Sequence, residues 1–336
     1  MSGLAGVAIV LTLLGAGLVS VCYFRSLRVS RSRIGSTSRL ASTASGRIDY
    51  ATSDDASAAS AHHLPILIIH GAGGGWDQGL DVGAPLAARG FRLIAPSRFG
   101  YLRTPLPADA SPAAQADAHA HLLDTLGIAR VAVIGVSAGG PSTLQFALRH
   151  PHRVSALVLL VPAAYAPRPG GRPSLATPSW TRVLFGTALR WDFLWWAAIR
   201  CARRIVTESI VGTPWAIVKS AAPGEQARVA QVIERIMPVS ARRLGLLNDA
   251  AVVGSLERYE LERIAAPALI FAARDCGFGT FEPARYTAQH IPGARFVAFE
   301  TGGHLCVGHQ AEIIEEVVRL LDRPNDLPVN TATDAR

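Results

Sequence analysis

The sequence predicts an α/β fold, with a mostly parallel central sheet that carries helices on both faces. Short apolar segments of strand type alternate with helical patterns along most of the chain, which is typical of βαβ units with right-handed crossovers. The chain has 336 residues, 49% of them hydrophobic and 17% charged, so it is long enough to bury a large core. An apolar N-terminal run accounts for part of the high hydrophobic content.

Residues 3–24 form that run, and none of them is charged. About 20 such residues cross a bilayer as a helix, so a transmembrane anchor is predicted over residues 1–25. A cleavable signal peptide is the alternative, but the basic segment that should precede its apolar core is missing, and so is a clean small-x-small cleavage site. Four arginines follow the run and favour a cytoplasmic position for the rest of the chain, namely Arg25, Arg28, Arg31 and Arg33.

Residues 26–45 are rich in serine and arginine and are predicted to be a flexible basic linker. Arg47–Ala51 is expected to be an early strand at the edge of the sheet. The formal net charge of +8 does not indicate nucleic-acid binding, because no basic stripe is interleaved with aromatic residues. The predicted domain plan is a core in two parts, residues 46–162 and 247–323, with an inserted helical cap over 163–246 and a tail over 324–336.

Buried strands and amphipathic helices alternate through both parts of the core. The strands are expected at Pro65–Ile69, Arg92–Ala95, Arg130–Ile134, Val154–Val161, Pro267–Ala273 and Ala294–Phe299, and the helices at Pro112–Leu126, Ser142–Arg149, Glu282–His290 and Gln310–Leu321. The strand segments are nearly continuous apolar runs, which is typical of parallel strands buried on both faces.

Within the cap the alternation stops, and proline and then tryptophan become frequent; the tryptophans are Trp180, Trp191, Trp195, Trp196 and Trp215. On one helical face lie Trp191, Leu194, Trp195, Ala198 and Ile199. We expect this face to pack on the core and to line an apolar pocket. Contact of the face with a membrane interface is the alternative.

The pentapeptide Gly135-Val136-Ser137-Ala138-Gly139 joins a predicted strand to a predicted helix. Small residues on both sides of a serine allow a sharp strand-to-helix turn that lifts the hydroxyl clear of the sheet, where it can act as a nucleophile. Upstream, the strand ending at Ile69 runs into His70-Gly71-Ala72-Gly73-Gly74-Gly75. A glycine-rich turn at this place can aim backbone N–H groups at a developing oxyanion.

An acid and a histidine follow two later strands. Asp275 comes just after Pro267–Ala273, and His304 ends a Gly302-Gly303-His304 sequence after Ala294–Phe299. Serine, acid and histidine therefore arrive in the order Ser…Asp…His, each past the C-terminal end of a strand.

With these motifs, from about Gly46 to Leu321, the chain resembles the α/β-hydrolase-fold serine hydrolases, whose triad has this chain order. The resemblance implies a catalytic triad of Ser137, Asp275 and His304 at the carboxyl edge of the sheet, and a variable helical cap. The oxyanion hole is expected from the N–H of Ala138 and, by the same resemblance, from the N–H of Ala72, two residues after the histidine. Gly73 is the fallback donor and is counted among the substrate-binding residues.

Some assignments stay open at this point. Asp249 is the reserve candidate for the acid, because the segment Asp275-Cys276-Gly277-Phe278-Gly279 departs from the commoner pattern. Arg98 either meets a substrate carboxylate or forms a structural ion pair. His70 is expected to order the glycine-rich turn. Cys276 is interpreted as a small packing residue.

These residues predict a serine hydrolase that cleaves an ester or related acyl bond of a small, mainly apolar substrate. A C–C bond hydrolase, a lyase, an aminopeptidase resembling proline iminopeptidase and a non-catalytic binding protein with the same fold are the alternatives. Serine at 137 argues against haloalkane dehalogenases and epoxide hydrolases, which carry aspartate there. No cofactor or metal is expected, because the cysteines lack paired spacing and the glycine-rich turn lacks the Lys-Ser/Thr ending of a P-loop. The oligomeric state is left open.

Overall fold

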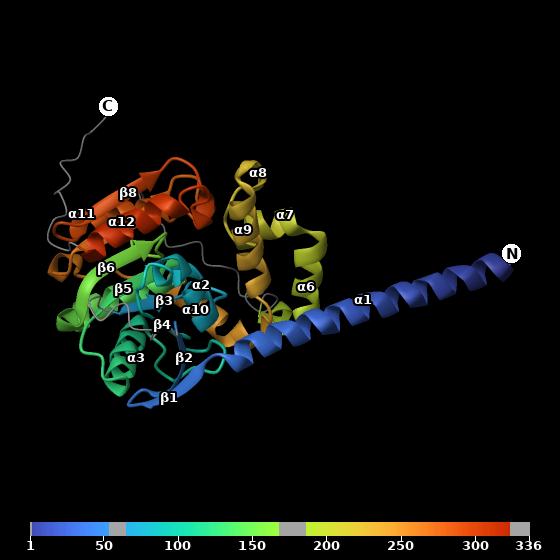
Figure 1. The fold of residues 1–336 in the computed structure, drawn as a ribbon, viewed down its shortest axis with the longest axis horizontal. Helices are drawn as coiled ribbons and strands as arrows, with labels where there is room; N and C mark the ends of the chain where they lie inside the picture. The colour runs from blue at the N-terminus through green and yellow to red at the C-terminus, as the bar shows by residue number, and fades with distance from the viewer. Residues whose placement is uncertain (1, 54–64, 168–185, 323–336) are drawn as a thin grey trace.

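The computed structural model describes residues 2–53, 65–167 and 186–322. At its centre lies an eight-stranded sheet of order β1-β2-β4-β3-β5-β6-β7-β8 (Figure 1). The strands are β1 (Arg39–Thr43), β2 (Gly46–Thr52), β3 (Ile66–Ile69), β4 (Leu93–Pro96), β5 (Val131–Val136), β6 (Val154–Leu160), β7 (Ala268–Ala273) and β8 (Arg295–Phe299). Neighbours from β4 to β8 pair in parallel, whereas β1 and β2 pair antiparallel, which confirms the mostly parallel sheet.

Helices cover both faces of the sheet. The core helices are α2 (Trp76–Ala87), α3 (Pro112–Thr125), α4 (Gly140–Arg149), α11 (Phe281–His290) and α12 (Gln310–Asp322). Leu67 and Ile69 of β3 pack with α3, α4 and α11, and Ile66 and Ile68 pack on the opposite face with α2 and α12. This division follows from the alternation of side chains along a strand, and it explains why the central strands are apolar throughout.

The predicted flexible linker is wrong within the described residues. A single helix, α1, runs from Ser2 to Ser36, and β1 follows it almost at once. Leu27 is buried, and the guanidinium of Arg33 binds the carboxylate of Asp77 at 2.8 Å and the carbonyl of Met237 at 2.7 Å. These contacts fix the segment on the body of the protein, although its composition resembles that of a tether.

The early strand is present as β2, but it does not form the edge of the sheet. β1 pairs with it on the outside, from Arg39↔Tyr50 to Thr43↔Gly46. The antiparallel pair adds a hairpin beside the parallel strands.

The cap is a group of short helices after β6: α6 (Asp192–Cys201), α7 (Arg203–Ile205), a π-helical turn (Val206–Ile210), α8 (Trp215–Ser220) and α9 (Pro223–Arg235), followed by the turn η4 (Ser240–Arg242) and α10 (Arg243–Gly254). Ile199, Trp195 and Ala198 pack into an apolar cluster made mainly of cap residues, which Leu305 and Val307 of the core join. Trp191 and Leu194 are instead 62% and 54% exposed, so the expected packing of that whole face on the core is wrong. Trp180 and residues 324–336 lie outside the described residues.

Candidate active site

Strand β5 delivers Ser137 into a strained turn. Ser137 has a φ of 49°, a left-handed conformation that residues with a Cβ rarely adopt. The glycines beside it are required by close approach: a Cβ on Gly135 would lie 2.3 Å from Thr143 Oγ1, and one on Gly139 would lie 2.6 Å from the carbonyl oxygens of Ile69 and His70. The turn η1 (Ser137–Gly139) and α4 then lead the chain away, which leaves the hydroxyl at the carboxyl end of the sheet.

The structure brings His304 to Ser137. The imidazole lies on the turn η6 (Gly303–Leu305), and its Nε2 is 2.8 Å from Ser137 Oγ. His304 is only 8% exposed, and this burial lowers its pKa to about 4. The ring is therefore neutral at pH 7, which is the state that can accept the proton of the serine hydroxyl.

Asp275 does not hold the imidazole. Its two carboxylate oxygens accept the backbone N–H groups of Gly302 and Gly303, at 3.2 and 2.8 Å, and no hydrogen bond of the described residues joins it to His304. The carboxylate fixes the turn that precedes the histidine. This arrangement differs from the predicted triad, in which Asp275 contacts the ring directly.

The thiol of Cys276 lies where the acid was expected. Its Sγ is 3.2 Å from His304 Nδ1, and the hydroxyl of Thr280 donates to the same sulfur at 3.1 Å. Consecutive side chains after β7 point in different directions, so Asp275 faces the glycines and Cys276 faces the imidazole. The interpretation of Cys276 as packing alone missed this contact. The signal in the sequence was the unusual Asp-Cys-Gly segment after the strand.

Two N–H groups remain for an oxyanion. Ala138 stands in the first turn of a helical segment, where N–H groups have no intrahelical partner. The N–H of Ala72 makes no hydrogen bond within the described part of the chain. The N–H of Gly73 donates to the hydroxyl of Tyr101 at 3.3 Å. Gly73 is thus engaged elsewhere, and Ala72 stays the better candidate for the second donor.

His70 orders the glycine-rich turn, as expected. Its Nδ1 donates to the carbonyl of Gly71 at 2.7 Å, and its Nε2 accepts the N–H of Arg98 at 2.9 Å. Burial, together with the charge of Arg98, holds the pKa of His70 well below its usual value. The ring is neutral, with its tautomer set by these two bonds.

Arg98 and Asp249 pair with each other, which is the structural ion pair expected as one alternative for Arg98 and which removes Asp249 as the reserve acid. The guanidinium of Arg98 makes two bonds to the Asp249 carboxylate, at 2.6 and 2.7 Å, and a third to the carbonyl of His70. The hydroxyl of Tyr101 also donates to Asp249. Asp249 is therefore not the acid that holds His304, and three of the five side-chain N–H groups of Arg98 are taken by Asp249 and by the carbonyl of His70.

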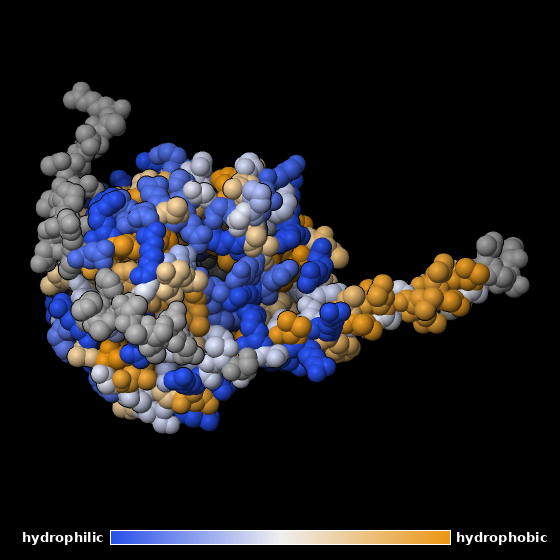
Figure 2. All heavy atoms as spheres, viewed as in Figure 1, coloured by the Kyte–Doolittle hydropathy of each residue, from blue (hydrophilic) through white to orange (hydrophobic). Residues whose placement is uncertain are grey.

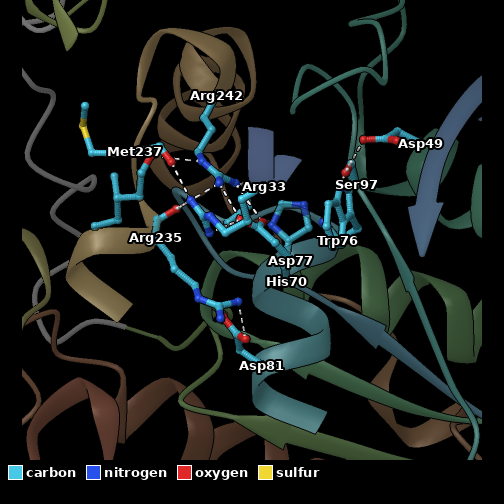
Figure 3. A network of polar contacts seen from close by, with 12 residues as sticks. Arg33, Asp49, His70, Trp76, Asp77, Asp81, Ser97, Arg235, Met237 and Arg242 are labelled. Atoms are coloured by element: carbon cyan, nitrogen blue, oxygen red, sulfur yellow. Dashed lines mark hydrogen bonds and ion pairs between the residues drawn. The ribbon is translucent and has the colours of Figure 1, made fainter. Parts of the chain in front are cut away.

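A second buried ion pair escaped the sequence analysis. Arg242 is fully buried and binds the Asp77 carboxylate, at 3.1 and 2.7 Å, together with the carbonyl of Gly74 (Figure 3). Arg33 of α1 binds the same carboxylate. The glycine-rich turn, the cap and α1 therefore meet at Asp77. Since the partners are far apart in the chain, no local pattern indicates this pair.

Within residues 2–53, 65–167 and 186–322, no group of three or more His, Cys, Asp or Glu side chains is placed to hold a metal ion. The groups described above bring a serine hydroxyl and a neutral imidazole together at the carboxyl end of the sheet.

Comparison with known proteins points to the α/β-hydrolase fold. A family model of the alpha/beta hydrolase fold matches residues 65–200. The uncharacterized hydrolase YcgS of Bacillus subtilis is 28% identical over 255 residues, which are 72% of this chain and 84% of YcgS. The 2-hydroxymuconate semialdehyde hydrolase of Pseudomonas putida is 37% identical over 100 residues, which are 29% of this chain and 36% of that enzyme.

A solved structure, the alpha/beta hydrolase fold protein from Nakamurella multipartita, matches with a TM-score of 0.63 and 25% identity, over 86% of this chain and 100% of that one. The order of the sheet, the turn at Ser137 and these matches show that the chain has the α/β-hydrolase fold.

Proposed function

We propose that the protein is a serine hydrolase that cleaves an ester or related acyl bond of a small, mainly apolar substrate. The observation that carries the proposal is the 2.8 Å contact between Ser137 Oγ and the neutral imidazole of His304. A serine in a strained strand-to-helix turn, bonded to a buried base, is the arrangement that activates a hydroxyl for attack on a carbonyl.

In the proposed reaction Ser137 Oγ attacks the acyl carbon while His304 Nε2 takes its proton. The N–H groups of Ala138 and Ala72 stabilise the oxyanion, and each such donor is worth about a hundredfold in rate. His304 then returns the proton to the leaving group, which releases the alcohol. A water molecule repeats the sequence on the acyl-enzyme and frees Ser137.

In this mechanism Cys276 takes the orienting position on the Nδ1 side of His304. When Nδ1–H points at the sulfur, Nε2 is free to accept the proton of the serine. A thiol is neutral and a weak acceptor, so it stabilises the imidazolium less than a carboxylate does. We therefore infer a competent but slow hydrolase, with Asp275 acting through the Gly302-Gly303 turn.

A C–C bond hydrolase is the second candidate, and the match to 2-hydroxymuconate semialdehyde hydrolase favours it. The same serine, base and oxyanion donors would act on a carbonyl beside the C–C bond that breaks. The choice between the two reactions depends on the substrate pocket and not on the catalytic side chains.

We further propose that α1 anchors the protein as a single-pass membrane protein with a cytoplasmic catalytic domain. The helix is long and apolar enough to cross a bilayer, with a mean hydropathy of 2.3 in its most apolar window. The arginines at 25, 28, 31 and 33 follow the apolar part, as the positive-inside rule requires for this orientation.

Labelling with a fluorophosphonate probe tests the catalytic proposal. Full-length protein in detergent should be labelled, and the Ser137→Ala variant should not. Turnover of p-nitrophenyl esters of increasing chain length is compared with turnover of a 2-hydroxy-6-oxo-dienoate, which separates the ester and C–C reactions. A folded wild type that is neither labelled nor active, or a Ser137→Ala variant of equal activity, would contradict the mechanism.

A further inference from the structure

A groove of about 1020 Å³ lies between α1 and the cap helices α6 and α9. One wall is apolar and includes Leu18, Val19, Trp196 and Ile199. The lining residues also include four arginines and a single acidic residue, Glu234; the arginines are Arg25, Arg33, Arg200 and Arg235. The groove thus combines an apolar wall with a net positive charge, next to the helix that we propose as the anchor.

The charge pattern of α1 decides where the groove lies relative to a bilayer. Residues 3–24 carry no charge, and Arg25 is the first charged residue after them. A membrane span includes the end of its apolar run, and the arginines that follow favour the headgroup region. The span therefore includes Leu18 to about Val21. Those residues stand beside the cap, so the α6 side of the cap lies at the level of the headgroups.

The cap cannot swing away from this position, because contacts fix α1 on the body. Tyr23 of α1 packs against Phe193 and Trp196 of α6, with ring centroids 5.2 and 5.7 Å away. At the other end, Arg33 binds Asp77 and the carbonyl of Met237 (Figure 3). Figure 2 shows the apolar part of α1 projecting from the body as one continuous stretch. The anchor and the groove therefore form one rigid unit.

The charges of the groove favour an anionic occupant. Arg33 is paired with Asp77, Arg235 with Asp81, and Arg200 with Glu234 at a looser 3.6 Å. In the described part of the chain, Arg25 makes no ion pair. Tyrosine, tryptophan and arginine are the side chains that favour the headgroup region of a bilayer.

We propose that the α6 side of the cap docks on the membrane surface and that the groove between α1, α6 and α9 seats the phosphate headgroup of an anionic phospholipid. The acyl chains of that lipid lie along Leu18 and Val19, and its phosphate meets Arg25 and Arg200. This inference rests on the proposed membrane anchor, but not on the catalytic mechanism.

A fluorescent label at Cys201 tests the docking. Cys201, at the end of α6, and Cys22 are exposed, whereas Cys276 and Cys306 are buried, so a Cys22→Ser variant is labelled at Cys201. The control carries Cys22→Ser, Cys201→Ser and Asp124→Cys, which places the label on α3, away from the free end of α1 (Figure 1). Full-length protein is reconstituted into vesicles of phosphatidylcholine, with or without phosphatidylglycerol, that contain a lipid spin-labelled at the headgroup.

The expected result is strong quenching at Cys201 and weak quenching at residue 124, with more quenching at Cys201 when phosphatidylglycerol is present. Arg25→Gln with Arg200→Gln should reduce the phosphatidylglycerol effect by about fivefold for each arginine removed. Arg89→Gln with Arg274→Gln removes the same charge from exposed arginines elsewhere and should leave the effect unchanged.

Resistance to alkaline extraction from the vesicles reports the anchor separately. Protein that resists extraction but shows equal quenching at both positions overturns the docking and leaves the anchor intact. Docking without any preference for phosphatidylglycerol overturns the headgroup site. Protein that is extracted by alkali overturns the anchor and the docking together. Ester turnover of the same samples tests the catalytic proposal separately from the anchor and the docking.

Discussion

Replacing Cys276 by aspartate should make the enzyme faster. The Sγ of Cys276 lies 3.2 Å from His304 Nδ1, and the hydroxyl of Thr280 already donates to that sulfur. A carboxylate oxygen reaches farther from Cβ than a sulfur does, which shortens this separation to ~2.8 Å, the length of a charge-assisted N–H···O bond. The new carboxylate would fix the tautomer in which Nε2 accepts the serine proton and would stabilise the imidazolium.

The size of the gain follows from the electrostatics of the site. Opposite unit charges about 4 Å apart attract by roughly 4 kcal/mol at an effective dielectric constant of 20. Cys276 is only 6% exposed, so a carboxylate at this position pays a desolvation cost that offsets part of this attraction. A remainder of about 3 kcal/mol corresponds to about a hundredfold in rate.

The assay is kcat/KM for a p-nitrophenyl ester as a function of pH. In the wild type the acid limb reflects His304, whose pKa is about 4, and activity falls as pH drops through that value because the ring becomes protonated. A carboxylate favours the protonated ring, so in Cys276→Asp the limb should move up by about two pH units. An unchanged limb and no gain in kcat/KM, in a variant with native circular dichroism, would refute the placement of Cys276.

Asp275→Asn is the matched control for that experiment. If Asp275 only fixes the Gly302-Gly303 turn, the variant should lose less than about tenfold in kcat and keep the position of its acid limb. If Asp275 is the triad acid, the loss should approach the ~10⁴-fold seen when a triad carboxylate becomes an amide.

Three further predictions concern buried ionisable groups. Asp249→Asn leaves the Arg98 guanidinium buried without its carboxylate, so the free energy of unfolding in urea should fall by about 3–5 kcal/mol. A loss of activity at unchanged stability would instead indicate that Asp249 is a catalytic residue. Arg242→Leu leaves Asp77 with Arg33 alone and should lower stability by a similar ~3 kcal/mol, and a loss below 1 kcal/mol by the same urea assay would contradict the pair as described. His119→Leu should reduce acid sensitivity, because both ring nitrogens of His119 lack a partner in the described residues and burial lowers its pKa from 6.5 to about 3. That ring is neutral in the folded state, so the stability that the wild type has above pH 6.5 is lost as the pH falls towards 3. Urea midpoints that decline equally in the wild type and in His119→Leu over this range would contradict the prediction.

The core strands could be predicted because their structure depends on residues that are close together in the sequence. Strands buried on both faces must be apolar throughout, and the turns that end them need glycine or proline, so each core strand lies within two residues of its predicted place. The elbow at Ser137 was predictable for the same reason. Its glycines are demanded by contacts with the adjoining strand and helix.

The parts that failed depend on partners far away in the chain. The segment after Phe24 resembles a tether in composition, but it continues the helix α1 and is held on the body by the pair between Arg33 and Asp77, which are 44 positions apart in the chain. The sequence analysis also assigned the wrong one of two adjacent residues, Asp275 and Cys276, to the contact with the His304 imidazole. Both residues follow β7 directly, and only the path of the turn decides which side chain faces His304.

The cap segment η4–α10 acts as part of the active-site scaffold. Arg242 from η4 binds the carbonyl of Gly74, and Asp249 from α10 holds Arg98, whose backbone N–H and side chain bind His70. Both ion pairs therefore hold the glycine-rich turn that carries Ala72. Breaking a buried pair costs about 3–5 kcal/mol. A conformation in which this segment is lifted would break two such pairs, at a cost of about 6 kcal/mol or more. Less than ~10⁻⁴ of the molecules would therefore adopt it. The position of Ala72, the proposed second oxyanion donor, thus depends on this cap segment. If the proposal holds, substitutions in η4 or α10 should change kcat through Ala72, even though neither element contacts Ser137 Oγ or His304 Nε2.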